Sequence, residues 1–340
     1  MSSVTIIQVA QRAGVSVKTV SRVLNGEPYV RDELKARVLE AAKALHYRPR
    51  VSARSLGGSR AYVLAYLLTD PSVPYFAQAQ LGALSACHRA GYHLVVESVD
   101  TAGDDLLEDL EGLFTTLTVD GVILTPPHGD NSHILEALER AGIAYVRIAP
   151  GSEVQRSPRV EADDRRAAHA MTACLLDLGH RRIGFIAGPA EHGAARSRLE
   201  GHRDALAERS VPVDEALIGQ GDFTFESGRE AAARMLAGAA RPTAVFAAND
   251  IMALGVMAEA QKLGIGVPSS LSVAGFDDAP FASMVWPALT TVRQPITEMA
   301  TAAAEMLIAR SARPRAGPGA DHAALHCELI IRDSTAPPPV

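Results

Sequence analysis

The sequence predicts an α/β protein with two doubly wound parallel-sheet lobes, preceded by a small all-α head of the helix-turn-helix type. Three observations support this fold class. Residues 4–45 carry apolar residues at helical spacing, interrupted by turn residues. From Tyr62 onward, short apolar runs typical of buried strands alternate with longer runs of helical periodicity. This alternation occurs as two successive sets, which is typical of two parallel sheets with helices on both faces.

The first helix is expected to begin after Thr5. Gln8 stands three residues after Thr5, which is the spacing of a capping box. Gly14 is expected to end this helix, because glycine accepts a positive φ at a helix C-terminus. Apolar residues at positions i, i+3 and i+4 form one face of it: Ile6, Val9 and Ala10.

Ser16 is expected to cap a second helix that begins almost at once. Its apolar face contains Val20, Val23 and Leu24. Its opposite face contains Val17, Lys18, Ser21 and Arg22. Two short helices joined by a Gly-containing turn form a helix-turn-helix, whose second helix enters a DNA major groove. The periodicity alone is equally compatible with an ordinary helical hairpin.

A third helix is expected over residues 31–45, although Arg31 at its start is not a capping residue type. Pro49 stops it, because the residue before a proline is excluded from the α region. The following residues VSARSL are compatible with one short helix that ends at Gly57 and Gly58. Six residues do not hold a helix alone in water, so a flexible linker is the alternative.

The body contains two sets of alternating elements. The first set predicts strands at 62–68, 93–99, 121–126 and 144–149, with helices near 75–90, 104–117 and 131–141. The second set predicts strands at 182–188, 217–222, 243–250 and 271–278, with helices near 164–178, 194–209, 225–238 and 250–263. Ligands of such sheets bind at the carboxyl ends of the strands. Two facing lobes form a cleft that closes by hinging.

Composition and motifs exclude several classes of protein. No apolar run of about 18 residues is present, and the N-terminus lacks the features of a signal peptide. The three cysteines are scattered, which fits a reducing cytoplasm. No GxSxG, HExxH, P-loop or dinucleotide-binding motif occurs in the sequence context that its function requires. The 11 histidines are not spaced as metal ligands. We therefore expect no enzymatic activity, no metal site and no cofactor.

The charge is distributed unevenly along the chain. Residues 1–60 hold 11 Lys and Arg against 4 Asp and Glu, a net charge of +7, whereas the remaining 280 residues carry a net charge of −13. A basic head on an acidic body indicates that the head binds a polyanion.

The run VTIIQVAQRAGVSVKTVSRVLNG (4–26) closely resembles the DNA-binding head of the LacI/GalR family of bacterial transcription repressors. Further runs similar to the family are LGHRRIGFIAGP (178–189), ARSRLEGH (195–202), AANDIMALG (247–255), SVAGFDDAPF (272–281) and LTTVRQP (289–295). The body of that family resembles periplasmic sugar-binding proteins. The resemblance implies that the chain crosses between lobes three times, near 160–164, 290–294 and 320–325.

The resemblance implies a DNA-binding head at 1–47, a hinge helix or linker at 48–60 and an effector-binding and dimerisation domain at 61–335. The N-lobe is expected to contain about 61–161 and 293–322, and the C-lobe about 162–292 and 323–335. Residues 336–340 are expected to form a flexible tail. The tail has no leucine heptads, which favours a homodimer over a larger assembly.

The resemblance also implies how the head contacts double-stranded operator DNA. Val17 is expected to touch a thymine methyl group, and Lys18 is expected to donate to a guanine. Leu56 is expected to wedge into a minor-groove base step and kink the DNA. Arg50 stands where the family usually has Asn, which leaves a phosphate contact there. The full set of expected DNA-binding residues is Thr5, Ser16, Val17, Lys18, Thr19, Ser21, Arg22, Asn25, Tyr47, Arg50, Ala53, Arg54 and Leu56.

For the effector, the resemblance implies a clamp formed by Asp277, Arg198 and Asn249. A carboxylate and a guanidinium each form two-pronged hydrogen bonds with vicinal hydroxyls. The aromatic rings of Phe76, Phe223 and Tyr75 are expected to stack on a pyranose face. Asp163 and Gln294, at the first and second crossings, are expected to add polar contacts. As alternatives, Asp277 or Asp278 caps the next helix, Arg198 forms a surface ion pair, and Phe76 belongs to the core.

One departure from the family concerns the effector. Ala194 stands where the family often has Ser or Thr, so the effector is expected to differ from those of the best-known members. His192 and Glu191 are candidates to compensate for the lost hydroxyl.

We interpret the sequence as a cytoplasmic repressor that associates with the nucleoid when it is bound to its operator. It is expected to act as a homodimer on a near-palindromic operator, without a membrane partner. Its effector is expected to be a mono- or disaccharide or a derivative. One alternative is a purine- or nucleobase-responsive repressor of the same family. Another is a solute-binding protein without DNA function, which the basic head and the missing signal peptide disfavour.

Overall fold

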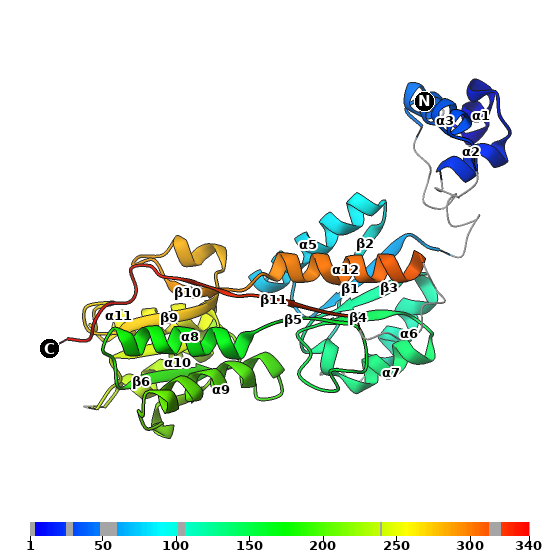
Figure 1. Cartoon of the computed structure of the whole chain (residues 1–340). Coiled ribbons are helices and arrows are strands. Elements are labelled where there is room, and N and C mark those ends of the chain that lie inside the picture. Colours follow the sequence, from blue (N-terminus) through cyan, green and yellow to red (C-terminus); the bar gives the residue numbers. More distant parts are fainter. Residues whose placement is uncertain are drawn as a thin grey trace. The chain divides into compact units, whose positions relative to one another are not determined.

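The computed structural model describes residues 4–24, 30–47, 60–100, 106–238, 240–312 and 321–339. The chain divides into two compact units, residues 1–62 and residues 63–340, which Figure 1 shows coloured along the sequence. The hinge helix predicted within 48–60 lies outside the described residues, so it stays a prediction. Each unit is described by itself below.

The first unit is a three-helix head. Its helices are α1 (Ile6–Ala13), α2 (Val17–Leu24) and α3 (Asp32–Ala44). Their apolar faces form one small core, made of Val9, Ala10, Ala13, Val20, Val23, Val38, Ala41 and Ala42. These residues lie at the helical spacings seen in the sequence, so burial of a shared apolar stripe accounts for the arrangement.

Local interactions set the ends of α1 and α2. The backbone N–H of Thr5 donates to Oε1 of Gln8 at 2.8 Å, which completes the predicted capping box. Gly14 adopts a φ of 62° and ends α1 as expected. Oγ of Ser16 accepts from the backbone N–H of Thr19 at 3.1 Å and caps α2.

Helix α3 begins without a capping side chain, as its sequence indicates. Arg31 occupies the N-cap position and makes no side-chain cap hydrogen bond. Asp32 and Glu33 in the first turn provide negative charge at the positive end of the helix dipole. Nη2 of Arg37 donates to the carbonyl oxygen of Ala13 at 2.6 Å, so α3 satisfies a free carbonyl at the end of α1.

The second unit contains two six-stranded sheets. The first sheet has the order β11-β5-β4-β3-β1-β2, with β1 (Val63–Leu68), β2 (His93–Ser98), β3 (Gly121–Leu124), β4 (Tyr145–Ile148), β5 (Arg159–Ala162) and β11 (His322–Leu325). The second has the order β12-β10-β9-β8-β6-β7, with β6 (Ile183–Ala187), β7 (Ile218–Gln220), β8 (Ala244–Ala247), β9 (Ser272–Asp277), β10 (Thr290–Arg293) and β12 (Glu328–Ile330). The described strand pairs are parallel except for β10 with β12.

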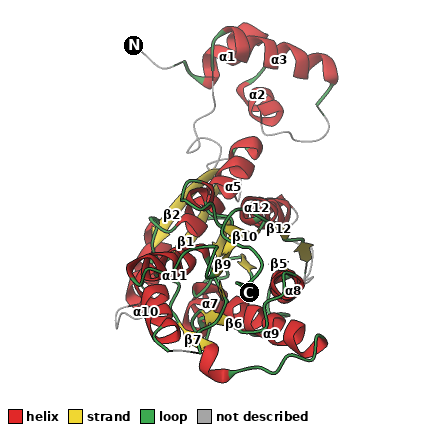
Figure 2. Ribbon diagram, turned by 90° about the vertical axis from the view of Figure 1, so that its left-hand side faces the viewer, coloured by secondary structure: helices red, strands yellow, loops and turns green. Residues whose placement is uncertain are grey.

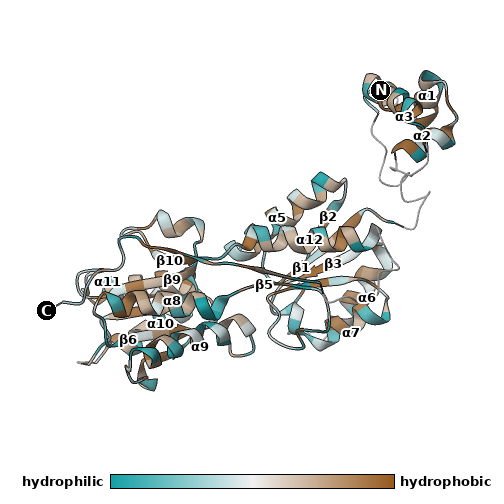
Figure 3. Cartoon of the chain, in the orientation of Figure 1, coloured by the Kyte–Doolittle hydropathy of each residue, from teal (hydrophilic) through white to brown (hydrophobic). Residues whose placement is uncertain are grey.

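Helices cover both faces of each sheet (Figures 1 and 2). The first lobe contains α5 (Pro74–Ala90), α6 (Leu106–Thr116), α7 (Ser132–Arg140) and α12 (Ile296–Ala312), with the short 3₁₀ helix η1 (His128–Asp130). The second contains α8 (Asp164–Asp177), α9 (Gly193–Glu208), α10 (Phe225–Leu236), α11 (Asp250–Lys262), η2 (Glu215–Leu217) and η3 (Pro280–Ser283). Figure 3 shows hydrophobic residues along the inner strands, which fits strands covered on both faces.

Each strand and helix predicted in the two alternating sets is present within a few residues of its expected place. Besides the three short 3₁₀ helices, five elements of the described residues were not predicted: β5, β10, α12, β11 and β12. The strands among them have only three or four residues, too few for a clear period. Helix α12 does carry a readable signal, because its buried residues fall at helical spacing: Ile296, Met299, Ala300, Ala303, Ala304 and Leu307.

The chain crosses between the lobes after β5, after β10 and after β11. The predicted boundaries between the lobes lie between residues 161 and 162, 292 and 293, and 322 and 323. Each boundary falls inside one of these strands, so each moves by one to three residues to the end of its strand. The physical reason is strand pairing. β11 pairs with β5 over its whole length, up to Leu325 beside Ala162, so both strands belong entirely to the first lobe.

The predicted flexible tail at 336–340 is also corrected as far as residue 339. The backbone N–H of Ala336 donates to Oγ of Ser272 at 3.0 Å, and this hydroxyl donates back to the carbonyl of Ala336 at 2.9 Å. Pro338 packs against Gly179. These contacts attach the last residues to the second lobe.

Candidate effector cavity and DNA-facing helix

The outer face of α2 is more exposed than its inner face. Val17 and Lys18 are exposed, while Ser21 and Arg22 are half-exposed. Val20 and Val23 on the opposite face are buried. A short helix with one exposed face of mixed apolar, hydroxyl and basic character has the form of a recognition helix.

The other predicted DNA-binding residues fall into two groups. Thr5, Ser16 and Thr19 take part in the helix caps described above, and Tyr47 packs against the core of the head. Five lie outside the described residues: Asn25, Arg50, Ala53, Arg54 and Leu56.

In the second unit, both lobes line a cavity of about 310 Å³. This volume is at the small end of the range for small-molecule sites, about 300–1,000 Å³. Seven of the eight predicted effector residues line it: Tyr75, Phe76, Arg198, Phe223, Asn249, Asp277 and Gln294. The remaining lining is largely apolar: Thr69, Val73, Pro74, Pro126, Pro127, Ala149, Pro189, His192, Ala194, Asp222, Thr224, Ile251 and Ala279.

The topology brings these residues together. Thr69 directly follows β1, and Asp222 and Asn249 follow β7 and β8 closely. Asp277 is the last residue of β9. Because parallel strands end at the same edge of a sheet, residues far apart in sequence meet in one cavity.

Arg198, on the second turn of α9, is buried at 4% exposure. Its Nε donates to Oδ1 of Asp164 at 2.7 Å, and its Nη1 donates to the carbonyl of Ala248 at 2.6 Å. Its Cζ lies 3.7 Å from the centroid of the Phe276 ring. The alternative of a surface ion pair is therefore wrong. Two of its five N–H donors are therefore engaged within the protein, and the predicted two-pronged contact with ligand hydroxyls stays a prediction that draws on the remaining N–H groups of Nη1 and Nη2.

Asp277 faces Arg198 at the end of β9. Its Oδ1 lies 3.6 Å from Nη1 of Arg198 and is buried with no hydrogen-bond partner among the described residues. The alternative helix-cap role is wrong, because η3 has Ala279 at its N-cap and no side-chain cap bond. The φ of Asp277 is 115°, a conformation that an L-residue rarely adopts. Strain of this kind concentrates at ligand sites.

Burial determines the charge state of the acidic cluster. Burial raises the pKa of Asp277 to about 7, against the opposing charge of Arg198. Burial also raises the pKa of Asp250, with a further increase from the charge of Asp277. Asp250 lies behind the cavity, where it accepts hydrogen bonds from Oγ1 of Thr291 and from the backbone of Ala279. Asp277 therefore titrates near neutral pH inside the cavity.

Aromatic rings form another part of the wall. Phe76 is 9% exposed and lies edge-on to Tyr75, with ring centroids 5.4 Å apart. Phe223 has a φ of 68°, and its ring lies so close to Gly188 that any Cβ there would collide with it. The close approach to Gly188 and a ring contact of 5.5 Å with His192 position Phe223 over the cavity.

Asn249 and Gln294 have different environments. Oδ1 of Asn249 accepts from the backbone of Met252 at 2.9 Å, and its Nδ2 donates to the carbonyl of Phe223 at 3.0 Å. Asn249 therefore caps α11 and positions Phe223. Gln294 is 3% exposed, and its Oε1 has no partner in the part of the chain that the structure describes. This oxygen is an open acceptor for a ligand.

Asp163 does not line the cavity, which corrects its predicted role. Its side chain is exposed and accepts from the backbone of Arg166 at 3.1 Å, so it caps α8. Its neighbour Asp164 contacts Arg198 instead. The sequence pointed to Asp164 only through the pair of adjacent aspartates at the first crossing. Which of the two contacts Arg198 depends on the residue at which α8 begins.

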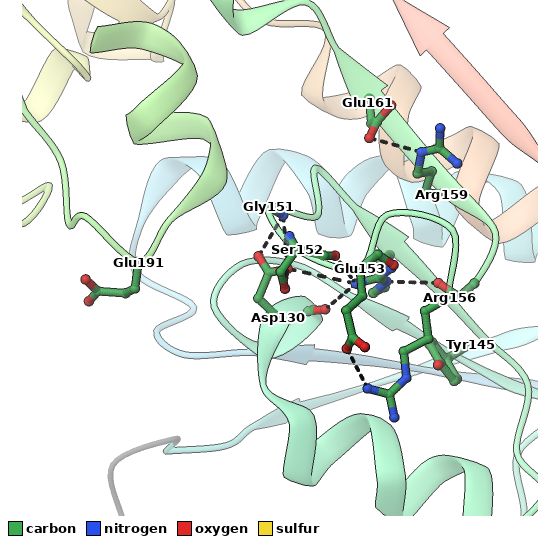
Figure 4. A network of polar contacts seen from close by, with 12 residues as sticks. Asp130, Tyr145, Gly151, Ser152, Glu153, Arg156, Arg159, Glu161 and Glu191 are labelled. Atoms are coloured by element: carbon green, nitrogen blue, oxygen red, sulfur yellow. Dashed lines mark hydrogen bonds and ion pairs between the residues drawn. The ribbon is translucent and has the colours of Figure 1, made fainter. Parts of the chain in front are cut away.

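A polar network holds the loop that borders the cavity at Ala149 (Figure 4). Arg147 is fully buried and donates to Oγ of Ser157 at 2.9 Å and to the carbonyl of Ser152 at 2.9 Å. Asp130 accepts from the backbone N–H groups of Gly151 and Ser152. The network therefore fixes Gly151 in place.

Gly151 of the first lobe meets Gly193 of the second lobe. Nη2 of Arg196 donates to the carbonyl of Gly151 at 2.9 Å across this contact. A Cβ at Gly193 would collide with the backbone of Gly151. The two glycines therefore allow the lobes to approach closely beside the cavity.

Replacing Gly193 by Ala is expected to weaken effector binding at least tenfold, because the added methyl group prevents this closure. Operator affinity without effector is expected to stay the same. Calorimetric titration of the effector measures the change. Gly112→Ala is the control, since no atom lies within 4 Å of a Cβ at that position. Equal affinity in Gly193→Ala and wild type would show that binding does not need the contact.

None of the described helices is long and apolar enough to span a membrane. Within the described ranges, no group of three or more His, Cys, Asp or Glu residues is placed to hold a metal ion.

Comparisons with known proteins agree with this architecture. Residues 5–50 match the family model "Bacterial regulatory proteins, lacI family", and residues 172–335 match a periplasmic binding protein-like domain. Catabolite control protein A of Priestia megaterium is 33% identical over 306 residues, covering 90% of this chain and 92% of that protein. The repressor PurR of Edwardsiella ictaluri (strain 93-146) is 36% identical over 343 residues, with 98% of both chains covered. The ribose operon repressor of Escherichia coli (strain K12) is 33% identical over 314 residues, covering 91% and 94%.

Solved structures are similar over nearly the whole chain. A complex of the transcriptional regulator CelR with cellobiose has a TM-score of 0.75 at 32% identity, covering 97% of this chain and 99% of that one. The lac repressor dimer bound to operator and the anti-inducer ONPF has a TM-score of 0.76 at 26% identity, covering 98% and 100%. With its helix-turn-helix head and two-lobed effector domain, the chain belongs to the LacI family of bacterial regulatory proteins, which are DNA-binding transcriptional repressors and not enzymes.

Proposed function

We propose that this repressor acts as a homodimer whose effector is a sugar or sugar derivative bound in the cavity between the lobes. The observation that carries the proposal is the buried pair of Asp277 and Arg198 beside the rings of Phe76 and Phe223. The cavity volume of about 310 Å³ favours an effector of monosaccharide size over a larger one.

The polar groups of the cavity match the chemistry of hydroxyls. Asp277 Oδ1 and Gln294 Oε1 are buried acceptors that need donors, while Nη2 of Arg198 remains to donate. A sugar hydroxyl both donates and accepts, so adjacent hydroxyls satisfy both kinds of group. The apolar lining and the aromatic rings match the C–H face of a pyranose. Related structures contain cellobiose and ribose, which supports a sugar for this chain.

Effector binding changes operator affinity through closure of the lobes. By linkage, operator DNA changes effector affinity by the same factor. The test is fluorescence anisotropy of labelled palindromes from the protein's own upstream region, at fixed salt, with and without a panel of monosaccharides and disaccharides. A sugar that changes operator affinity supports the proposal. Purines are included in the test because the chain is 36% identical to PurR. If only a purine changes operator affinity, the proposal that the effector is a sugar is wrong.

Effector affinity is expected to increase with pH up to about 7 and then to level off. Asp277 has a pKa of about 7 in the free protein. Hydroxyls that donate to its carboxylate stabilise the charged form, so the complex has a lower pKa and binding releases a proton. Below pH 7, affinity is expected to fall by up to about tenfold per pH unit. Calorimetric titration from pH 5.5 to 8.5 measures this, and a flat profile would contradict the contact.

We further propose that α2 reads the operator through Val17 and Lys18, whose side chains are exposed on the outer face of the head. Lys18→Ala is expected to relax base preference at one position per half-site, by about 1–3 kcal/mol, because Lys donates to acceptors on guanine. Binding selection from a randomised operator library measures the preference profile. Lys35→Ala, on α3, is the control with the same charge change. An unchanged preference profile for Lys18→Ala would show that Lys18 does not contribute to base recognition.

A further inference from the structure

We propose that the cavity selects uncharged effectors and rejects phosphorylated or carboxylated ones, because Asp164 neutralises Arg198 from within the protein. This inference rests on the proposed effector site and names the charge class of its ligand. Asp164 is thereby a specificity-determining residue that acts through Arg198.

Arg198 is the only Lys or Arg side chain among the described residues that line the cavity. His192 also lines it, but burial lowers the pKa of this imidazole, which keeps it neutral at neutral pH. Two carboxylates line the cavity as well, Asp277 and Asp222. An anionic ligand therefore meets one cation and two acidic groups.

The single cation is already paired. Nε of Arg198 lies 2.7 Å from Oδ1 of Asp164, and both side chains are buried. Burial raises the pKa of Asp164 while the guanidinium opposes this shift. A guanidinium stays protonated in a protein, and a buried one requires a compensating charge. Among the carboxylates near Arg198, that of Asp164 makes the shortest contact. It therefore supplies the compensating negative charge, and the Asp164–Arg198 pair presents no net positive charge to a ligand.

The geometry of the guanidinium leads to the same conclusion. Phosphate and carboxylate bind arginine most strongly through two parallel hydrogen bonds to one edge. Nε on one edge is engaged by Asp164, and Nη1 on the other edge is engaged by the carbonyl of Ala248. The edge formed by Nε and Nη2 therefore has no free pair of donors. At the edge formed by Nη1 and Nη2, an anion would share Nη1 with the carbonyl of Ala248 and would lie beside Oδ1 of Asp277.

The open groups of the cavity require donors from the ligand. Oδ1 of Asp277 and Oε1 of Gln294 are buried acceptors without a partner among the described residues. A hydroxyl donates to them, whereas an ionised phosphate or carboxylate presents acceptors and negative charge. Placing an anion beside Asp277 adds like-charge repulsion in a site that is largely shielded from water. We therefore expect discrimination of at least a hundredfold.

The first experiment compares matched ligand pairs on the full-length protein by calorimetric titration. The probes are ribose and ribose 5-phosphate, glucose and glucose 6-phosphate, and glucose and gluconate. For any sugar that binds, its anionic counterpart is expected to bind at least a hundredfold more weakly. An anionic member that binds as tightly as its neutral counterpart would overturn the inference while leaving the sugar proposal intact. If hypoxanthine or guanine binds and the sugars do not, the sugar proposal fails and the selection for uncharged ligands stands.

The second experiment does not depend on knowing the effector. It measures the Tm of the full-length protein against inorganic phosphate at constant ionic strength. Asp164→Asn keeps the side-chain shape and an acceptor for Arg198 but leaves the guanidinium charge uncompensated. Phosphate is expected to raise the Tm of this variant more than that of the wild type. Asp163→Asn is the matched control, because it changes the adjacent, exposed carboxylate that caps α8, and Asn also caps helices. Equal phosphate shifts in Asp164→Asn and wild type would overturn the role of Asp164.

Discussion

Asp277→Asn is expected to reduce effector affinity by at least a hundredfold and to leave the operator affinity of the effector-free protein unchanged. The carboxylate offers the ligand a buried oxygen that accepts no hydrogen bond from the described residues, and hydrogen bonds to a charged group contribute about 1.5–3 kcal/mol each. Asn is the appropriate replacement because it tolerates the positive φ of 115° better than other residues of its size. Operator anisotropy with increasing effector measures both quantities in one titration.

The neighbouring residue provides a matched control. Asp278 carries the same charge but pairs with Arg293 at 2.8 Å and with Arg332 at 2.6 Å, and it does not line the cavity. Asp278→Asn is expected to lower Tm and to keep effector affinity within about twofold, since binding energies are lost only where ligand contacts are lost. A normal effector response in Asp277→Asn would show that the cavity assignment is wrong.

Operator affinity is expected to fall about a thousandfold or more when salt increases from 50 to 200 mM. The head region, residues 1–60, carries a net charge of +7, and the proposed homodimer would present two such heads to the DNA. Each phosphate that a protein neutralises releases condensed counterions, so the affinity depends steeply on the salt concentration. The slope of log affinity against log salt, measured by anisotropy, gives the number of neutralised phosphates.

Effector binding in the same salt series is the internal control. Arg198 and Asp164 are buried, and buried pairs are screened much less than exposed charges. Effector affinity is therefore expected to change only slightly over the range in which operator affinity collapses. A flat operator response would argue against DNA binding by the head.

Much of the fold was predictable because it depends on local chemistry. The capping box of Thr5 and Gln8 and the left-handed Gly14 involve residues within one turn of each other. The buried strand β1, VLAYLL, is recognisable as an apolar run bounded by polar residues. The seven cavity residues were predicted from the resemblance to the LacI/GalR family, and the topology brings several of them together because parallel strands end at one edge.

Other features needed contacts between distant parts of the chain. Strands β11 and β12 have three or four residues each, and β11 exists because it pairs with β5, more than 150 residues earlier. The tail at Ala336 is ordered by Ser272 and not by its own Pro-rich sequence. Neither feature has a local signal of sufficient length.

Periodicity and caps in the sequence determined the helices of the head and the two alternating α/β lobes, because these signals are local. The resemblance to the LacI/GalR family supplied the helix-turn-helix assignment and most of the cavity residues. Only the tertiary structure decided how those residues act. Asp163 and Asp164 are adjacent and chemically alike, yet one caps α8 and the other neutralises Arg198. The environment of Arg198 is assembled from Asp164, Ala248 and Phe276, which lie 34, 50 and 78 positions away along the chain. The balance of charge in the cavity therefore arises from packing between elements, which no single stretch of sequence encodes.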